Sequence, residues 1–183
     1  MTSSERGRGS TAVLSLGSNL GDRLGYLRLA VAGFADAEDT ELVAASPVYE
    51  TAPWGGVPQD DFLNAVLIVR SDTLDEWGWL RRAQELEARA GRVRTVHWGP
   101  RTLDVDVVTV FATDQRGSAV HSDHPDLRLP HPGAAERNTV LRPWLDVAPD
   151  AVLPGHGAVA ELLAGLGEAG MRRRDDLALE VKA

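Results

Sequence analysis

The order in which strand and helix patterns alternate is the feature of this sequence that most limits its possible folds. In the first helical pattern, Leu24, Leu27, Val31 and Phe34 are separated by 3, 4 and 3 positions, which places them on one face of a helix. The strand and helix patterns follow one another as strand 11–16, helix 22–37, strands 40–49 and 62–69, helix 72–91 and strand 102–111. This βαββαβ order predicts an α+β, ferredoxin-like core, with two helices packed on one face of an antiparallel sheet.

Local signals set the expected boundaries. Asp72 and Thr73 offer an N-cap for the second helix, and Gly91 offers its end. Pro47 indicates that the run 40–49 lies at a sheet edge or ends there. A C-terminal extension follows the core, with a Pro- and His-containing stretch at 121–132, an apolar segment at 140–147 and a helix at 158–166. We expect a disordered tail at 1–10, a single domain at 11–167, and a tail or short edge strand (LALEV) within 168–183.

The basic residues are almost all arginine. Of the 19 Lys and Arg residues, only Lys182 is a lysine. A Walker A phosphate loop, a protein-kinase strand lysine and a Schiff base each need an internal lysine, so these chemistries are excluded. The chain also has no cysteine, which excludes disulfides, a thiol nucleophile and a thiolate metal site.

The net charge of -8 argues against a general attraction to nucleic acid or to an anionic membrane surface. No apolar run approaches the roughly 20 residues that a membrane span needs, and residues 1–10 lack the apolar region of a secretory signal. We therefore expect a cytoplasmic protein, and a monomer, that binds neither nucleic acid nor membranes.

Asp104 and Asp106 are the most informative polar residues. On a strand, positions i and i+2 point to the same face, with Cβ atoms about 6 to 7 Å apart. Two such carboxylates can hold a pair of Mg²⁺ ions about 3.5 to 4 Å apart, the arrangement that acts on a phosphate being transferred. The alternative is a strand with an exposed acidic face, although like charges side by side need compensation.

Arginines near this pair offer such compensation. Between 81 and 101 there are six arginines against Glu85 and Glu87, a local charge of +4. The arginines at 81, 82 and 89 fit a solvated helix face. Arg92, Arg94 and Arg101 lie in or beside a loop, and their planar guanidinium groups suit multidentate phosphate contacts. Carboxylates with such arginines indicate a metal and polyphosphate site, in which transfer depends on positioning and charge neutralisation.

A second group of residues surrounds the loop 51–59. A flat heteroaromatic ligand could stack on Phe62 while the Asn64 amide contacts its polar edge. The alternative is that Phe62 belongs to the core and that Asn64 is a turn or bulge residue.

Four blocks together resemble the 6-hydroxymethyl-7,8-dihydropterin pyrophosphokinase family of folate biosynthesis. They are LSLGSNLGDR (14–23), SPVYETAPWGGVPQDDFLNAV (46–66), GRVRTVHWGPRTLDVDVV (91–108) and LPHPGAAERNTVLRPWLDVAP (129–149). The resemblance covers about 11–153 and implies a ferredoxin-like domain that transfers the β,γ-pyrophosphoryl group of ATP to the pterin hydroxymethyl oxygen. ATP and the pterin would be its substrates, and AMP and the pterin diphosphate its products.

The resemblance also implies roles for individual residues. Asp104 and Asp106 would hold two Mg²⁺ ions, and Arg92 and Arg94 would act in catalysis from a loop that closes over the site. The ATP-side residues would be Gln84, Glu87, Trp98, Arg101, Val107, His131 and Arg137. The pterin-side residues would be Thr51, Ala52, Trp54, Phe62, Asn64 and Thr139.

Three positions depart from the pattern of the family. Phe62 stands where some members have Tyr, and Ala52 replaces a common proline. Thr139 occupies a position that is usually Phe, on the far side of the pterin from Phe62. A threonine cannot complete an aromatic sandwich, so we expect weaker pterin binding by about 0.5 to 1.5 kcal/mol, without loss of chemistry.

Other interpretations remain open at this point. A different Mg²⁺-dependent phosphate enzyme would explain Asp104 and Asp106, and a non-catalytic pterin or nucleotide-binding module would fit the loss of Phe at position 139. His121, Asp123, His124 and His156 are candidates for a transition-metal cluster, although their surroundings favour a polar loop. Trp77 and Trp79 cannot share a helix face, and we expect Trp77 in the core and Trp79 at an edge.

Overall fold

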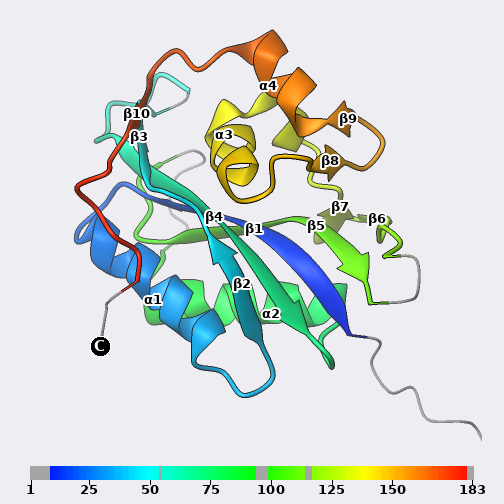
Figure 1. Cartoon of the computed structure of the whole chain (residues 1–183). Helices are drawn as coiled ribbons and strands as arrows, with labels where there is room; N and C mark the ends of the chain where they lie inside the picture. Colours follow the sequence, from blue (N-terminus) through cyan, green and yellow to red (C-terminus); the bar gives the residue numbers. More distant parts are fainter. Residues whose placement is uncertain (1–8, 54, 94–98, 114–116, 181–183) are drawn as a thin grey trace, which may run out of the picture.

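The computed structural model describes residues 9–53, 55–93, 99–113 and 117–180. Strand β1 (Ser10–Ser18) lies in the middle of the main sheet, between β4 (Phe62–Ser71) and β5 (Asp104–Ala112), and is antiparallel to both. Strands β2 (Glu41–Ala45) and β3 (Tyr49–Thr51) both pair with the other edge of β4. This antiparallel order confirms the α+β, ferredoxin-like prediction (Figure 1).

The expected single strand at 40–49 is two strands. Strand β2 pairs with residues 67–70 of β4, whereas β3 pairs with residues 62–64 of the same strand. Pro47 lies in the gap, where it cannot donate a ladder hydrogen bond, and Ser46 caps the interruption by accepting the Val66 N–H on its Oγ at 2.9 Å. The interruption frees β3 to lead directly into the loop that follows Thr51.

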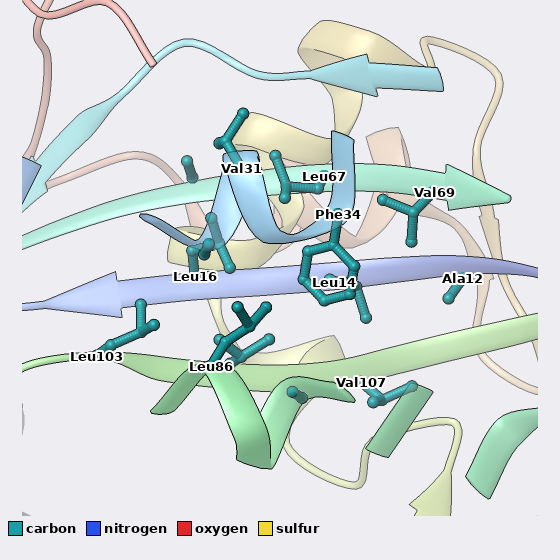
Figure 2. Packing of buried hydrophobic residues seen from close by; sticks show 14 of the residues in the cluster. Ala12, Leu14, Leu16, Val31, Phe34, Leu67, Val69, Leu86, Leu103 and Val107 are labelled. Carbon is teal, nitrogen blue, oxygen red and sulfur yellow. The ribbon is translucent and has the colours of Figure 1, made fainter. Parts of the chain in front are cut away.

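Helices α1 (Arg23–Ala35) and α2 (Glu76–Arg89) cover one face of the sheet, as predicted (Figure 1). Figure 2 shows Phe34 of α1 and Leu86 of α2 packed over Leu14, Leu67 and neighbouring strand residues. The start of the second helix differs from the prediction. Ser71 Oγ accepts the N–H groups of residues 73 and 74 in a turn, and Asp75 then caps α2 by accepting the Gly78 N–H at 2.8 Å.

The opposite face of the sheet is also covered, which the sequence did not reveal. Helix α3 (Asn138–Val147), predicted only as an apolar segment, and helix α4 (Val159–Leu166) pack there with the 3-10 helix η1 (Ala134–Glu136). Leu141 and Trp144 meet Val13, Val66 and Val108 in this second core. Because both faces are covered, the three central strands are nearly continuously apolar.

Two short hairpins follow the main sheet strands in sequence, and Leu127 and Leu129 of the first are buried in the core on the side of α1 and α2. Strands β6 (Ser122–His124) and β7 (Leu127–Leu129) form a hairpin in the stretch that follows β5. Strands β8 (Val152–Leu153) and β9 (Gly157–Ala158) form a second hairpin that leads into α4. No helix among the described residues is long and apolar enough to cross a membrane.

The two ends of the described chain are more ordered than expected. Ser10, placed in the N-terminal tail by the sequence, is the first residue of β1 and is buried. At the other end, the edge strand is β10 (Met171–Arg173), which pairs with β3, and LALEV forms no strand within its described part, 177–180. Leu179 of that segment is instead buried in the core on the side of α1 and α2.

The expectation for the two tryptophans was wrong. Trp79 is fully buried, 6.2 Å from the Phe34 ring, and its Nε1–H donates to Ser10 Oγ at 2.7 Å. Trp77 is only partly buried and meets the His124 ring edge-on at 4.9 Å. The buried face of α2 carries Trp79, Ala83 and Leu86, separated by 4 and 3 positions, and Trp77 lies off that face.

We expect Trp79→Ala to lower the free energy of unfolding by about 3 to 5 kcal/mol, because it opens a large cavity and leaves Ser10 Oγ without its donor. Trp77→Ala is the matched control in the same helix and should cost clearly less. Urea unfolding followed by far-ultraviolet circular dichroism measures both. Equal losses for the two variants would contradict the assignment of Trp79 as the core residue.

Candidate active site

Strand β5 places Asp104 and Asp106 on one face, as the sequence predicts. Val105, between them, is buried in the core on the side of α1 and α2, while the aspartates keep 16% and 34% of their side chains exposed. In the pairing with β1, Asp104 lies opposite Gly17 and Asp106 lies opposite Ser15. The start of β5 thus presents two carboxylates side by side.

Three arginines meet these carboxylates. Arg92 Nη1 lies 2.6 Å from Asp104 Oδ1, and Arg101 pairs with the other oxygen of Asp104. Arg137, immediately before α3, has its Nη1 3.6 Å from Asp106 Oδ2. Among the described residues, both oxygens of Asp104 are therefore paired, whereas the ion pair of Asp106 is longer and its arginine more exposed.

Glu87 supports this arrangement from the last turn of α2. Its buried carboxylate pairs with Arg92 and accepts the Val105 N–H on Oε1 at 2.9 Å. The contacts of Glu87 thus hold both an arginine of the site and the backbone between the two aspartates. Glu87 therefore supports the site from the side of α2.

The two aspartates differ in pKa. Burial and the neighbouring Asp104 charge raise the pKa of Asp106 to about 7, and Arg137 only partly offsets this. Burial also acts to raise the pKa of Asp104, but the guanidinium groups of Arg101 and Arg92 outweigh it and hold that pKa below its usual range. The neighbouring arginines therefore favour the charged form of Asp104, but they do not fully offset the factors that disfavour the charged form of Asp106.

This donor set fits Mg²⁺. Carboxylate oxygens are its preferred protein ligands, and Mg²⁺ is usually bound by one or two carboxylates, with water and substrate phosphates completing the shell. Within the described ranges, no group of three or more His, Asp or Glu residues is gathered for a metal. Of the histidines considered for a transition-metal cluster, His124 instead packs against Trp77. The carboxylate pair is thus an open site of the kind that a phosphate-bound ion occupies.

A cavity of about 340 Å³ adjoins the carboxylates. It brings together residues from four separate segments of the chain. Its lining residues are Thr51, Gly55, Gln59, Phe62, Asn64, Arg101, Gly133, Glu136, Arg137 and Thr139. The predicted pterin-side residues Thr51, Phe62, Asn64 and Thr139 therefore lie around the same cavity as the predicted phosphate-side residues Arg101 and Arg137.

Asn64 is held in place within this cavity. It lies on β4 opposite Tyr49 and Gly17, and its Nδ2 donates to Thr51 Oγ1 at 2.6 Å. A Cβ atom on Gly17 would come within 3.4 Å of Asn64 Oδ1 and 3.6 Å of the Phe62 ring. These are ordinary van der Waals distances, so the amide and the ring lie beside the backbone of β1 at Gly17. The alternative placement of Asn64 in a turn or bulge is wrong, because it lies in a regular part of the β4 ladder.

Asn19 is a site residue that the sequence reasoning missed. Its buried side chain donates from Nδ2 to Gln59 Oε1 at 2.8 Å and to the Asp60 carbonyl at 2.9 Å, and its Oδ1 accepts the Arg101 N–H at 2.8 Å. Its own N–H donates to the Arg101 carbonyl at 3.0 Å. Asn19 thus joins the loop after β3 to the segment before β5. The signal that could have identified Asn19 is its position in the block LGSNLGDR, which resembles the family.

The remaining predicted residues lie elsewhere or outside the described ranges. Val107 is buried in the core and Gln84 is exposed on α2, so neither lines the cavity (Figure 2). His131 Nδ1 accepts the Gly133 N–H at 3.1 Å, and burial and then the charge of Arg137 lower the pKa of this histidine. Ala52 lines a second, smaller cleft. The predictions for Trp54, Arg94 and Trp98 fall on residues outside the described ranges.

We expect Asp106→Asn to stabilise the metal-free protein at pH 8. The folded pKa of about 7 lies above the unfolded value of about 3.9, so the charged form costs stability as the pH rises between the two. Because about a third of the side chain is exposed, the gain should be only about 1 kcal/mol, and it should shrink as the pH falls toward 4.

Asp104→Asn is the matched control with the opposite sign. Its lowered pKa means that the charged form stabilises the fold, so the variant should be less stable than wild type at pH 8. Urea unfolding in EDTA at pH 8 and pH 5 measures both variants. A loss of stability in Asp106→Asn at pH 8 would show that its charge is compensated.

Comparison with known proteins identifies the family. A family model described as 7,8-dihydro-6-hydroxymethylpterin-pyrophosphokinase (HPPK) matches residues 13–149. A Mycobacterium tuberculosis protein named 2-amino-4-hydroxy-6-hydroxymethyldihydropteridine pyrophosphokinase is 51% identical over 159 residues, covering 84% of this chain and 82% of that protein. A Methylorubrum extorquens protein of the same name is 40% identical over 162 residues, covering 88% of this chain and 97% of that protein.

Solved structures agree on the fold. The wild-type Plasmodium falciparum HPPK-DHPS with SDX-DHP is similar at a TM-score of 0.66, with 13% identity, over 93% of this chain and 48% of that chain. This chain spans about half the length of that solved chain, and the likeness concerns the fold alone. The family match, the relatives and the fold lead to one conclusion: the chain belongs to the 7,8-dihydro-6-hydroxymethylpterin-pyrophosphokinase family of enzymes.

Proposed function

We propose that this chain transfers the β,γ-pyrophosphoryl group of ATP to the hydroxymethyl oxygen of 6-hydroxymethyl-7,8-dihydropterin, a step of folate biosynthesis. The products are AMP and the pterin diphosphate. The observation that carries the proposal is the shared cavity, in which Phe62 and Asn64 face the same space as Arg101 and Arg137. These arginines also pair with Asp104 and Asp106, so a ring-binding site and a phosphate-binding site adjoin each other.

The reaction exchanges one bond to phosphorus for another. The pterin hydroxymethyl oxygen forms a bond to the β-phosphorus of ATP, the bond from that phosphorus to the oxygen shared with the α-phosphate breaks, and AMP leaves. The hydroxyl proton is released, so atoms and charge balance. No covalent enzyme intermediate is needed, because such transfers depend on in-line positioning and charge neutralisation.

The residues of the cavity supply the positioning. Phe62 offers an apolar face for the flat pterin, and Asn64, tied to Thr51, offers a fixed amide for its polar edge. Arg101 and Arg137 line the same cavity, and guanidinium groups bind phosphate oxygens through paired hydrogen bonds, so these arginines can hold a polyphosphate beside a bound pterin. Arg92, held by Asp104 and Glu87, adds a third guanidinium group at the edge of the site.

Asp104 and Asp106 are the residues that would hold two Mg²⁺ ions. Bound Mg²⁺ supplies neutralisation of phosphate charge and orientation of the reacting oxygens. The raised pKa of Asp106, which Arg137 only partly offsets, supports this assignment, because a bound cation would favour the charged form of this carboxylate.

One assay tests the proposed reaction. The protein is incubated with ATP, Mg²⁺ and 6-hydroxymethyl-7,8-dihydropterin, and the nucleotides are then resolved. We expect AMP that forms only when the pterin is present. ADP, or nucleotide hydrolysis without pterin, would instead indicate another Mg²⁺-dependent phosphate enzyme. Binding of both ligands without turnover would indicate a non-catalytic module.

We expect Asp104→Ala and Asp106→Ala each to lower turnover by several orders of magnitude, because each removes a ligand from ions on which the transfer depends. Asp123→Ala is the control, since Asp123 is an exposed carboxylate on strand β6 outside the cavity. Steady-state kinetics with saturating ATP and pterin measure the effect. Turnover within tenfold of wild type for either site variant would remove that aspartate from the proposed role.

Thr139 should limit pterin affinity. It lines the cavity together with Phe62, and Thr139→Phe should therefore tighten pterin binding by about two- to tenfold through a second stacking face. Thr139→Val has a similar size but no ring, and should leave affinity unchanged. Titration of the pterin in the presence of a non-hydrolysable ATP analogue measures both. Unchanged affinity in Thr139→Phe would show that threonine causes no deficit.

A further inference from the structure

Glu50 is the centre of an ion-pair cluster beside the proposed pterin site. It directly precedes Thr51 on β3, and only 14% of its side chain is exposed. Arg172 Nη2 lies 2.5 Å from Glu50 Oε1, Arg174 Nη1 lies 2.9 Å from Oε2, and Arg23 Nη2 lies 3.3 Å from Oε2. We call these four residues the Glu50 cluster. None of them has a role in the proposed transfer.

The cluster joins the two ends of the loop that borders the cavity. Glu50 lies immediately before that loop, and Arg23 also donates from Nη1 to the Asp61 carbonyl at 2.8 Å, immediately before Phe62. Arg23 therefore contacts both ends of the segment 50–61. The last part of this segment is also held by Asn19, which donates hydrogen bonds to Gln59 and to the Asp60 carbonyl.

The C-terminal segment, residues 168–180, supplies the other two arginines. Strand β10 pairs with β3 in the register Met171 with Thr51 and Arg173 with Tyr49, and the Arg174 N–H donates to the Val48 carbonyl at 2.8 Å. Figure 1 shows this segment running from α4 along the sheet edge toward α1. There Arg28 Nε donates to the Ala178 carbonyl at 2.9 Å. The C-terminal segment is therefore fixed to the sheet through β3 and to the helical layer through α1.

The charges make the cluster sensitive to the loss of any member. Burial opposes the charge of Glu50, but Arg172, Arg174 and Arg23 together hold the pKa of Glu50 below its usual value. Without Glu50, three guanidinium groups would be left close together, with Asp176 paired to only one of them, Arg174. Without the two C-terminal arginines, the partly buried Glu50 would keep only Arg23, its longest contact. Either change favours movement of β3 away from its present position.

We propose that the Glu50 cluster, anchored by the C-terminal segment, is a positioning device that holds Thr51 and Phe62 at the spacing the pterin requires. The proposal rests on the proposed function for the identity of the ligand. It assigns a substrate-site role to Arg172 and Arg174, which lie beyond the region 13–149 matched by the family model.

The test uses three variants of the full chain. Arg172→Ala/Arg174→Ala removes the C-terminal side of the cluster, and Glu50→Gln removes its centre. Arg173→Ala is the matched control, because Arg173 lies between the two arginines in sequence but makes its ion pairs with Asp175 at 2.6 Å and Asp146 at 4.0 Å, outside the cluster. We expect KM for the pterin to rise about five- to tenfold in the first two variants, with kcat and KM for ATP within twofold of wild type. Arg173→Ala should match wild type in all three.

Combining the changes tests whether the residues act as one unit. In Glu50→Gln/Arg172→Ala/Arg174→Ala, KM for the pterin should rise no further than in either parent, because the same contacts are already lost. If the rise in KM for the pterin equalled the product of the rises in the two parents, the residues would act independently, which would contradict the proposal that they form one unit. Equal changes in KM for ATP and for the pterin, or no change in either, would overturn the positioning role.

A ligand-free measurement keeps the inference separate from the proposed function. Hydrogen exchange of the backbone amides at 49–52 and 61–64 should be faster in both site variants, while exchange in α2 stays as in wild type. Unchanged exchange at 49–52 and 61–64 would overturn the proposal even if the kinetics shifted. If the wild-type protein makes no pterin-dependent AMP, the proposed function fails, while the exchange data still decide whether the cluster positions the loop. If the double arginine variant does not fold, Glu50→Gln alone decides.

Discussion

The repulsion between Asp104 and Asp106 is the constraint around which the site is built. Placing two carboxylates on one face of β5 is unfavourable in a partly buried position, and arginines from three parts of the fold compensate the charge. Arg92 comes from the end of α2, Arg101 from the segment before β5, and Arg137 from the start of α3. Elements on both sides of the sheet must therefore be in place before the pair is tolerated. The pKa of Asp106 is nevertheless raised to about 7, which supports the proposal that a cation binds at this pair.

The same arginines connect this electrostatic problem to the adjoining cavity. Arg101 and Arg137 have one side toward a carboxylate and another toward the space bounded by Phe62 and Asn64. Glu87 and Asn19 do not line that space, yet they fix the backbone of Val105 and Arg101 through buried hydrogen bonds. Residues that hold the backbone thus determine where the ligand-facing groups lie.

Local sequence patterns were enough to predict the βαββαβ order and the face shared by Asp104 and Asp106, because both follow from side-chain periodicity. The same patterns could not show that α3 covers the second face of the sheet, since an apolar stretch of this length fits a helix or a strand equally well. The exchange of Trp77 for Trp79 arose because the second helix has apolar residues on more than one face. Packing on the sheet selects the face that carries Trp79, Ala83 and Leu86, and local periodicity does not decide between the faces.

The site was predicted unevenly for a related reason. Charged and aromatic residues such as Arg101 and Phe62 indicate by their type which ligands they could bind. The structure brings them together around one cavity. Asn19 and Glu87 act through backbone groups that are distant in sequence, so nothing in their local pattern indicates the partner. The Glu50 cluster joins residues more than a hundred positions apart, and only the fold reveals it.

The pairing of β10 with β3 has a consequence for how the protein is made. Strand β3 is synthesised early, but its outer neighbour β10 follows more than a hundred residues later in the chain. Until then, three residues of β3 present an unpaired edge beside the loop that borders the cavity, open to pairing with another chain. Translation that stops before Met171 would therefore leave a chain that has most of its core but exposes an unpaired edge of β3, which can pair with another chain.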